Sequence, residues 1–229
     1  MIYFLCASIV YVCVLVFFKP SPNSLKEAPL SFFKNFKSIR VSLFSGLLFL
    51  IIFLFVSDFK FLIINETLLK ILALNNIWEL SKLWPLQGIT HLFIHYDLLH
   101  VATNVIGIGL ASIYERRVGS KRFLIVLVVA SLASIPSVIF YPKGVLVCGI
   151  SGGVFGLFAA FWIDHKNLTF KEWIYAIIGF VFIVILLSFE NEIGTISSLD
   201  LKYSIDHIGH AMGVIGVIIY CRLKPRCFA

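Results

Sequence analysis

Residues 144–163 read GVLVCGISGGVFGLFAAFWI, and this stretch decides what kind of fold the chain adopts. It carries no charged residue and is long enough to cross a bilayer as a helix, which takes about 20 residues. Ser151 lies inside it, in the sequence Gly149-Ile150-Ser151-Gly152. Polar groups are costly in lipid and commonly mark function when they face a protein interior. The stretch therefore predicts a membrane helix with a functional serine.

Similar apolar runs occupy much of the remaining chain. Of its 229 residues, 60% are hydrophobic and 14% are charged, whereas a soluble domain has about 25% charged residues. The composition therefore predicts an all-α polytopic membrane protein. The charge-free runs cover 1–18, 41–57, 98–114, 123–142, 144–163, 173–189 and 207–221.

The connections between these runs alternate in their content of basic residues. Lysine and arginine are frequent in 19–40, 115–122, 164–172 and 222–226, and they are sparser in the other connections. Because basic connections remain in the cytoplasm, the pattern predicts a six-helix core with both of its ends on the cytoplasmic side. Topology thus explains the net charge of +7, and we predict no nucleic-acid partner.

The chain divides into three predicted parts. Residues 1–18 are predicted as an extra N-terminal transmembrane helix with its N-terminus outside, because they lack the basic start and the cleavage site of a signal peptide. Residues 19–40 form a basic cytoplasmic linker, and residues 41–229 form the six-helix core. Within that core, 58–90 is too polar to span the membrane, so we predict an outer loop with amphipathic pieces.

Four polar side chains are predicted to lie at one depth in the bilayer. Three core helices run inwards, so depth follows from the number of residues to the cytoplasmic end, at about 1.5 Å per residue. This places Ser151 at roughly 20 Å, His210 at roughly 18 Å, His100 at roughly 22 Å and Asn104 at roughly 16 Å above that end. In a hydrocarbon core about 30 Å thick, the layer lies about 10 Å below the outer surface. Such a site needs a water-filled cavity open to the outside.

The same four groups meet the requirements of nucleophilic catalysis. A serine needs a base to accept its proton, and histidine titrates near neutrality. The developing oxyanion needs donors, which His100, Asn104 and the backbone N–H of Ser151 could supply. Gly152 and Gly156 are four residues apart, and so are Gly209 and Gly213. This spacing favours close approach of the helices that bear the serine and the histidine, although a role in packing alone explains these glycines equally well.

Several motifs, in order, resemble those of the rhomboid family of intramembrane serine proteases. The resemblance covers the chain from about residue 90 to the C-terminus. THLFIH at 90–95, followed by His100 and Asn104, is similar to the family's second core helix. YERRVGS at 114–120 is similar to its cytoplasmic turn, and residues 149–152 to its nucleophile motif. DHIGHAMG at 206–213 is similar to the sixth-helix segment that carries the base.

The resemblance implies a role for each of these residues. Ser151 would be the nucleophile and His210 the general base of a dyad without a carboxylate, while His100 and Asn104 would stabilise the oxyanion. His210 is preferred to His207 because glycine follows it at the third position, as in the family pattern. Structural or supporting roles would fall to His91, His95, Glu115, Gly149, Gly152, Phe155, His207 and Gly213.

The resemblance also implies substrates and a location. The substrates would be transmembrane proteins in the lipid bilayer, cleaved near their outer ends without a metal or any other cofactor. The protein would be a multi-pass component of the cell membrane of a bacterium, with its active site open to the outer face. Two departures from the family pattern stand out: Leu86-Gln87 replaces a Trp-Arg pair, and Phe155 replaces a frequent tyrosine.

Two other functions are compatible with parts of the sequence. A non-catalytic rhomboid-like protein that binds membrane clients would be expected to lose the serine or the histidine, and both are present. A haem or metal protein could use His91, His95, His207 and His210, whose spacing permits ligation. That hypothesis leaves the serine motif unexplained, and the chain has no H-E-x-x-H sequence.

Overall fold

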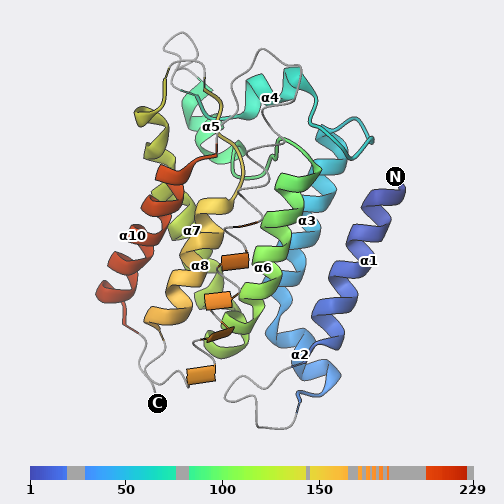
Figure 1. Cartoon of the computed structure of the whole chain (residues 1–229), viewed down its shortest axis with the longest axis vertical. Helices are drawn as coiled ribbons and strands as arrows, with labels where there is room; N and C mark the ends of the chain where they lie inside the picture. Colours follow the sequence, from blue (N-terminus) through green and yellow to red (C-terminus); the bar gives the residue numbers. More distant parts are fainter. Residues whose placement is uncertain are drawn as a thin grey trace.

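The computed structural model describes residues 1–19, 29–75, 83–142, 145–164 and 205–225, together with isolated positions between 170 and 185. Over these residues the protein is an all-α bundle, in which long apolar helices stand side by side and two short helices cover one end (Figure 1). This confirms the predicted fold class. The helices are α1 (Ile2–Phe17), α2 (Phe32–Ser38), α3 (Arg40–Val56), α4 (Glu66–Leu72), α5 (Trp84–Thr90), α6 (Leu98–Val118), α7 (Ser120–Ser134), the 3-10 helix η2 (Ile135–Phe140), α8 (Ser151–Ile163) and α10 (His207–Leu223).

The lengths of these helices fit an integral membrane protein. Helix α6 and the continuous stretch of α7 and η2 are each 21 residues long and apolar enough to cross a membrane. Helices α2 and α3 pass the same test together, although they are bent by 66°. Helices α1, α8 and α10 are apolar but shorter, with 16, 13 and 17 residues. The predicted core helix over 173–189 lies outside the described residues except for isolated helical positions, and so does part of the linker, 20–28.

Helix α8 is shorter than the apolar run that predicts it. The run begins at residue 144, but the helix begins only at Ser151. Before it, Val147 and Leu74 exchange backbone hydrogen bonds of 2.9 and 3.0 Å, and Gly149 has a φ of +102°, which glycine tolerates. Both features interrupt the helix. Non-helical backbone at membrane depth needs protein around it, and residues 145–148 are buried.

Helices α7, α8 and α10 meet closely on small residues. A Cβ atom on Gly213 of α10 would overlap the carbonyl oxygen of Gly152 in α8. One on Gly156 would overlap the side chain of Ala130 in α7. Larger side chains at these glycines would force the helices apart, so the small residues determine how near α8 and α10 can lie.

The segment between α3 and α6 folds over one end of the bundle, which we call the α4/α5 end. Trp84 Nε1 donates to the carbonyl oxygen of Asn75 at 2.5 Å. Gln87, which is fully buried, accepts from Asn75 Nδ2 at 3.1 Å and donates to the carbonyl oxygen of Ile71 at 3.1 Å. Gln87 therefore anchors this segment.

Candidate active site

Ser151 is the first residue of α8, directly after the non-helical segment. Its position follows from Gly149, whose positive φ turns the chain, and from Ile150, which precedes the helix. The first N–H groups of a helix have no partner inside the helix, so they are free to bind a negative charge. Ser151 thus stands at a helix start that has such N–H groups, and the residue is partly exposed.

His210 lies in the first turn of α10 and contacts the serine. Its Nε2 atom is 2.7 Å from Ser151 Oγ, a hydrogen-bond distance. The imidazole stacks on the ring of Phe155, with centroids 4.3 Å apart and planes at 17°. His207 is exposed, and its ring centroid lies 6.0 Å from that of His210. Of the two histidines, the structure brings His210 to the serine and holds its ring on Phe155.

Asp206 fixes the start of α10, a role that the sequence left open. Its Oδ1 atom accepts from the backbone N–H of Gly209 at 2.6 Å and from the Tyr141 hydroxyl at 2.9 Å. Its Oδ2 atom accepts from the Ser137 hydroxyl at 2.5 Å. The carboxylate therefore joins the turn that carries His210 to η2. An aspartate three residues before Gly209 is an N-cap signal, but its partners in η2 have no sequence signature.

His100 and Asn104 lie on α6 beside the segment that precedes the serine. A Cβ atom on Gly149 would lie only 2.6 Å from His100 Nε2, so the imidazole packs directly on this turn. Asn104 Nδ2 donates to the carbonyl oxygen of His100 at 2.9 Å, which occupies one of its two N–H groups. Both residues are buried. His100 thus lies beside the turn that carries the serine, and Asn104 follows it by one helical turn.

His91 and His95 hold the segment in front of α8. His91 forms a 2.7 Å hydrogen bond through Nδ1 with the carbonyl oxygen of Gln87, and its own carbonyl oxygen accepts from the N–H of Gly149 at 2.7 Å. His95 is fully buried, and its ring meets those of Phe49 and His100 edge-on, at 5.6 and 5.0 Å. These contacts join α5 to the turn that carries the serine.

Comparison with models of protein families shows which family the chain belongs to. The family model described as Rhomboid domain matches residues 81–225, more than half of the protein. The chain belongs to the rhomboid family. The match confirms the resemblance of the sequence motifs and covers α5, α6, α7, α8 and α10. No curated protein matches the chain.

Rhomboid membership carries a general function. It places the protein in a family of intramembrane proteases that act on transmembrane proteins within the bilayer, and rhomboid-like relatives without protease activity also exist. The matched region contains Ser151, His210, His100 and Asn104. Helices α1 to α4 precede it.

Glu115 connects three elements of this rhomboid bundle at the end opposite to α4 and α5. It is fully buried on α6 and accepts from the backbone N–H groups of Val41 and Ser42 at 2.9 and 2.8 Å. It also accepts from the hydroxyls of Ser42 and Ser120, each at 2.6 Å. The carboxylate thereby caps the start of α3 and fixes α7 against α6.

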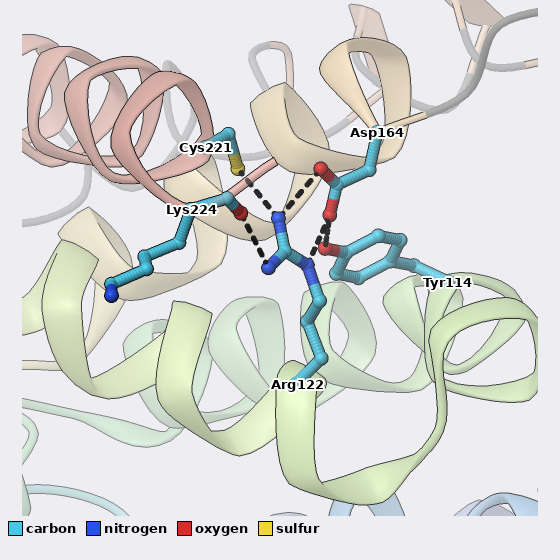
Figure 2. A network of polar contacts seen from close by, with 5 residues as sticks. All are labelled: Tyr114, Arg122, Asp164, Cys221 and Lys224. Atoms are coloured by element: carbon cyan, nitrogen blue, oxygen red, sulfur yellow. Dashed lines mark hydrogen bonds and ion pairs between the residues drawn. The ribbon is translucent and has the colours of Figure 1, made fainter. Parts of the chain in front are cut away.

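A second polar network at the same end joins the helices of the dyad (Figure 2). Arg122 of α7 forms a bidentate ion pair with Asp164, which follows α8, at 2.6 and 2.8 Å. It also donates to the carbonyl oxygen of Lys224, which follows α10, at 2.9 Å, and to Cys221 Sγ at 3.6 Å. Tyr114 donates to Asp164 at 2.6 Å. Burial raises the pKa of the Asp164 carboxyl, but hydrogen bonds from Arg122 and Tyr114 outweigh burial and lower it below its ordinary value.

Two histidines of the metal hypothesis have other partners in this rhomboid bundle. Within the described part of the chain, no group of three or more His, Cys, Asp or Glu side chains could hold a metal ion. His91 bonds to Gln87, and His210 bonds to Ser151.

Proposed function

We propose that this rhomboid protein is an intramembrane serine endopeptidase that hydrolyses transmembrane substrate proteins with a Ser151–His210 dyad. The observation that carries the proposal is the 2.7 Å contact between His210 Nε2 and Ser151 Oγ, made at the start of α8. A serine that merely packs in a membrane helix bonds to its own backbone. Here the serine instead faces an imidazole whose plane is held by Phe155.

The reaction would proceed through an acyl-enzyme. Ser151 Oγ attacks the scissile carbonyl carbon while His210 Nε2 accepts the hydroxyl proton. His210 then gives this proton to the leaving amine as the C–N bond breaks. A water molecule then gives a proton to the same nitrogen and attacks the acyl carbon. The ester bond to Ser151 Oγ breaks, and His210 returns the proton to this oxygen.

Stabilisation of the tetrahedral intermediate falls to fixed donors. The backbone N–H of Ser151 lies at the start of a helix, and His100 packs against the turn immediately before it. Asn104, one helical turn after His100, has a second N–H group beyond the one bonded to the His100 carbonyl. We assign these groups to the oxyanion because donors that are already in place lower the barrier without reorganisation.

The substrate side of the proposal follows from the position of the dyad. Ser151 and His210 both lie at the ends of their helices nearer to α4 and α5 (Figure 1). With the orientation predicted from basic residues, this end faces outwards, so water enters and cleavage occurs near the outer end of a substrate helix. The host membrane would be the cell membrane of a bacterium. The water-filled cavity remains a prediction.

Labelling and cleavage together test this function. Purified protein should react with a fluorophosphonate and cleave a reporter transmembrane substrate in liposomes, and Ser151→Ala and His210→Ala should abolish both. His207→Ala is the matched control, because His207 lies on the same helix one turn away and is exposed. It should retain activity. Wild-type protein that binds the reporter without cleaving it would instead indicate a client-binding relative.

A further inference from the structure

Helix α1, which lies before the matched rhomboid region, is joined to the bundle by buried polar contacts. Arg116 of α6 donates through Nη2 to the carbonyl oxygen of Phe18 at 2.9 Å, just past the end of α1. Asn35 of α2 donates to the carbonyl oxygens of Leu15 and Val16 at 3.1 and 3.0 Å, and it accepts from Arg116 Nε at 3.0 Å. These donors satisfy carbonyl groups that a helix end leaves unpaired.

Tyr11 fixes the middle of α1 in the same way. Its hydroxyl donates to the carbonyl oxygen of Ser42 at 2.7 Å. A Cβ atom on Gly46 of α3 would overlap the Tyr11 ring, and one on Gly109 of α6 would lie 3.1 Å from it. The ring therefore occupies space that the two glycines leave open. The distance between α1 and α6 is set by these contacts.

A groove remains between α1 and α6, beside the fixed contacts. Its volume is about 420 Å³, which is within the range of ligand pockets, about 300–1,000 Å³. Its walls are apolar, with Val10 and Val14 on α1 and Ala102 and Ile106 on α6. The hydroxyls that reach it are already paired: Tyr11 with Ser42, and Ser112 with Arg116 at 2.8 Å. A hydrocarbon chain fits such walls, because an unfilled groove forfeits dispersion contacts on every side.

A chain of hydrogen bonds links the groove to α2. Ser112 lines its lower end and accepts a hydrogen bond from Arg116, and Arg116 in turn bonds to Asn35 of α2. Figure 1 shows α2 beneath the lower ends of α1 and α3. A molecule whose chain lies in the groove would therefore place its polar end beside α2.

Helix α2 presents aromatic and basic residues to its surroundings. At about 100° per residue, the phenylalanines lie on one side of the buried Asn35, and Lys34 and Lys37 lie on the other. A helix with this arrangement lies in a membrane interface, its rings towards the acyl chains and its cations towards the headgroups. The exposed fractions of the rings are 48% for Phe32, 84% for Phe33 and 41% for Phe36.

The positive charges at α2 are exposed. Lys34, Lys37 and Arg40 are all exposed, and within the described residues none of them takes part in an ion pair. Glu115, the acidic residue that caps α3 close by, is buried and saturated with hydrogen bonds. Anionic groups outside the protein can therefore approach these cations.

We propose that the groove and α2 together bind one anionic glycerophospholipid from the membrane leaflet that meets α2. One acyl chain lies between α1 and α6, and the phosphate lies beside Lys34, Lys37 and Arg40. Basic residues beside a membrane attract anionic headgroups, and the apolar groove selects the chain. The site is on α1, α2 and α6, so it is independent of the dyad and of proteolysis.

The retention of anionic over neutral lipid tests whether the cations at α2 bind the headgroup. Full-length protein in nanodiscs is released into neutral detergent, and bound phosphatidylglycerol and phosphatidylcholine with identical chains are counted by native mass spectrometry. Wild type should retain the anionic lipid at least about tenfold better. Lys34→Gln/Lys37→Gln/Arg40→Gln should remove this preference. Changing exposed cations elsewhere, Lys121→Gln/Lys171→Gln/Arg222→Gln, should leave it intact.

A tryptophan placed in the groove tests the chain part. Val14→Trp should reduce retention of both lipids, because it fills space that the acyl chain needs. Ile9→Trp is the matched control, since Ile9 is 60% exposed on α1 but does not line the groove. The proposal is overturned if wild type retains both lipids equally or if Val14→Trp has no effect. It is also overturned if Val14→Trp only dissociates a dimer, because a second copy would then fill the groove.

Discussion

Asn104 and Thr103 offer a controlled test of the oxyanion site at the scale of single residues. Both side chains donate to the carbonyl oxygen of His100, at 2.9 Å each. If Asn104 also binds the oxyanion, Asn104→Ala should lower kcat by about 10²–10³ with little change in KM. Thr103→Val removes the other bond to the same carbonyl and should leave kcat close to wild type. Steady-state cleavage of a reporter substrate measures both, and equal losses would reduce Asn104 to a structural role.

Single residues also show where reasoning from sequence stops. Ser151 and His210 are found because their chemistry is rare in apolar runs and because their predicted depths agree. Asp206 and Gln87 are different, because their partners come from distant segments. Asp206 bonds to Ser137 and Tyr141, 69 and 65 positions away along the chain. Local patterns identify a cap at Asp206, but only the fold shows what it binds.

At the scale of elements, the close contact of α8 and α10 brings serine and histidine together. A Cβ atom on Gly213 would meet the backbone of Gly152, which cannot move aside as a flexible side chain can. Gly213→Ala should therefore separate the helices and lower kcat strongly, even where the protein still folds. Gly88→Ala on α5 is the control, because a Cβ atom there meets nothing within 4 Å. Fluorophosphonate labelling reports the dyad directly, and unchanged labelling of Gly213→Ala would contradict this account.

The ion pair below the dyad predicts how stability depends on pH. Because hydrogen bonds lower the pKa of Asp164 in the folded state, this group stabilises the protein above its unfolded pKa of about 3.9. That contribution is lost as the pH falls through the lower folded value. Thermal unfolding in detergent should show a Tm that drops below about pH 4.

Two variants test whether Asp164, rather than another carboxylate, causes the loss of stability in acid. Asp164→Asn should lower the free energy of unfolding by about 1–3 kcal/mol at neutral pH, because the partly buried Arg122 loses its charged partner. It should also make Tm depend less on pH below about pH 4. Glu66→Gln removes a carboxylate from an exposed pair with Lys70, which contributes little. The Tm of Glu66→Gln should depend on pH as that of the wild type does. An unchanged pH dependence of Tm in Asp164→Asn would assign the acid sensitivity to another group.

The sequence predicts the boundaries of some helices better than those of others, for a physical reason. The run over 41–57 locates α3 to within one residue at each end. The runs over 98–114 and 207–221 locate the starts of α6 and α10, but these helices continue past the runs by four and two residues. The run over 144–163 does not reveal that its first part is extended, because buried strands and buried helices are equally apolar. Val147 is extended because it pairs with Leu74, which is far away in the sequence.

For the whole molecule, the sequence carries a pattern for topology but none for packing. Alternating basic connections and charge-free runs predict how the chain passes back and forth. They do not reveal that α1 is held by Arg116, Asn35 and Tyr11, because each of these contacts joins residues at least 19 positions apart. The groove between α1 and α6 is likewise a product of packing.

The course of α1 yields a topology that can be measured in intact membranes. The amino group of Met1 lies 3.5 Å from the carbonyl oxygen of Phe59, in the turn after α3, so the N-terminus is at the α4/α5 end (Figure 1). With 16 residues, α1 is about 24 Å long, and we expect its two ends to reach opposite interfaces of a thinned or locally adapted bilayer. We expect the N-terminus outside and α2 inside.

Single cysteines in a cysteine-free background test this arrangement. A maleimide that cannot cross membranes should label Tyr3→Cys in intact cells, because Tyr3 is exposed at the outer end of α1. Lys37→Cys on α2 should react only after permeabilisation, and so should Lys121→Cys at the start of α7, which serves as the inner reference. If Tyr3→Cys instead reacts together with Lys121→Cys, α1 does not cross the membrane. Both the seven-helix topology and the position of α2 beside the inner leaflet would then be wrong.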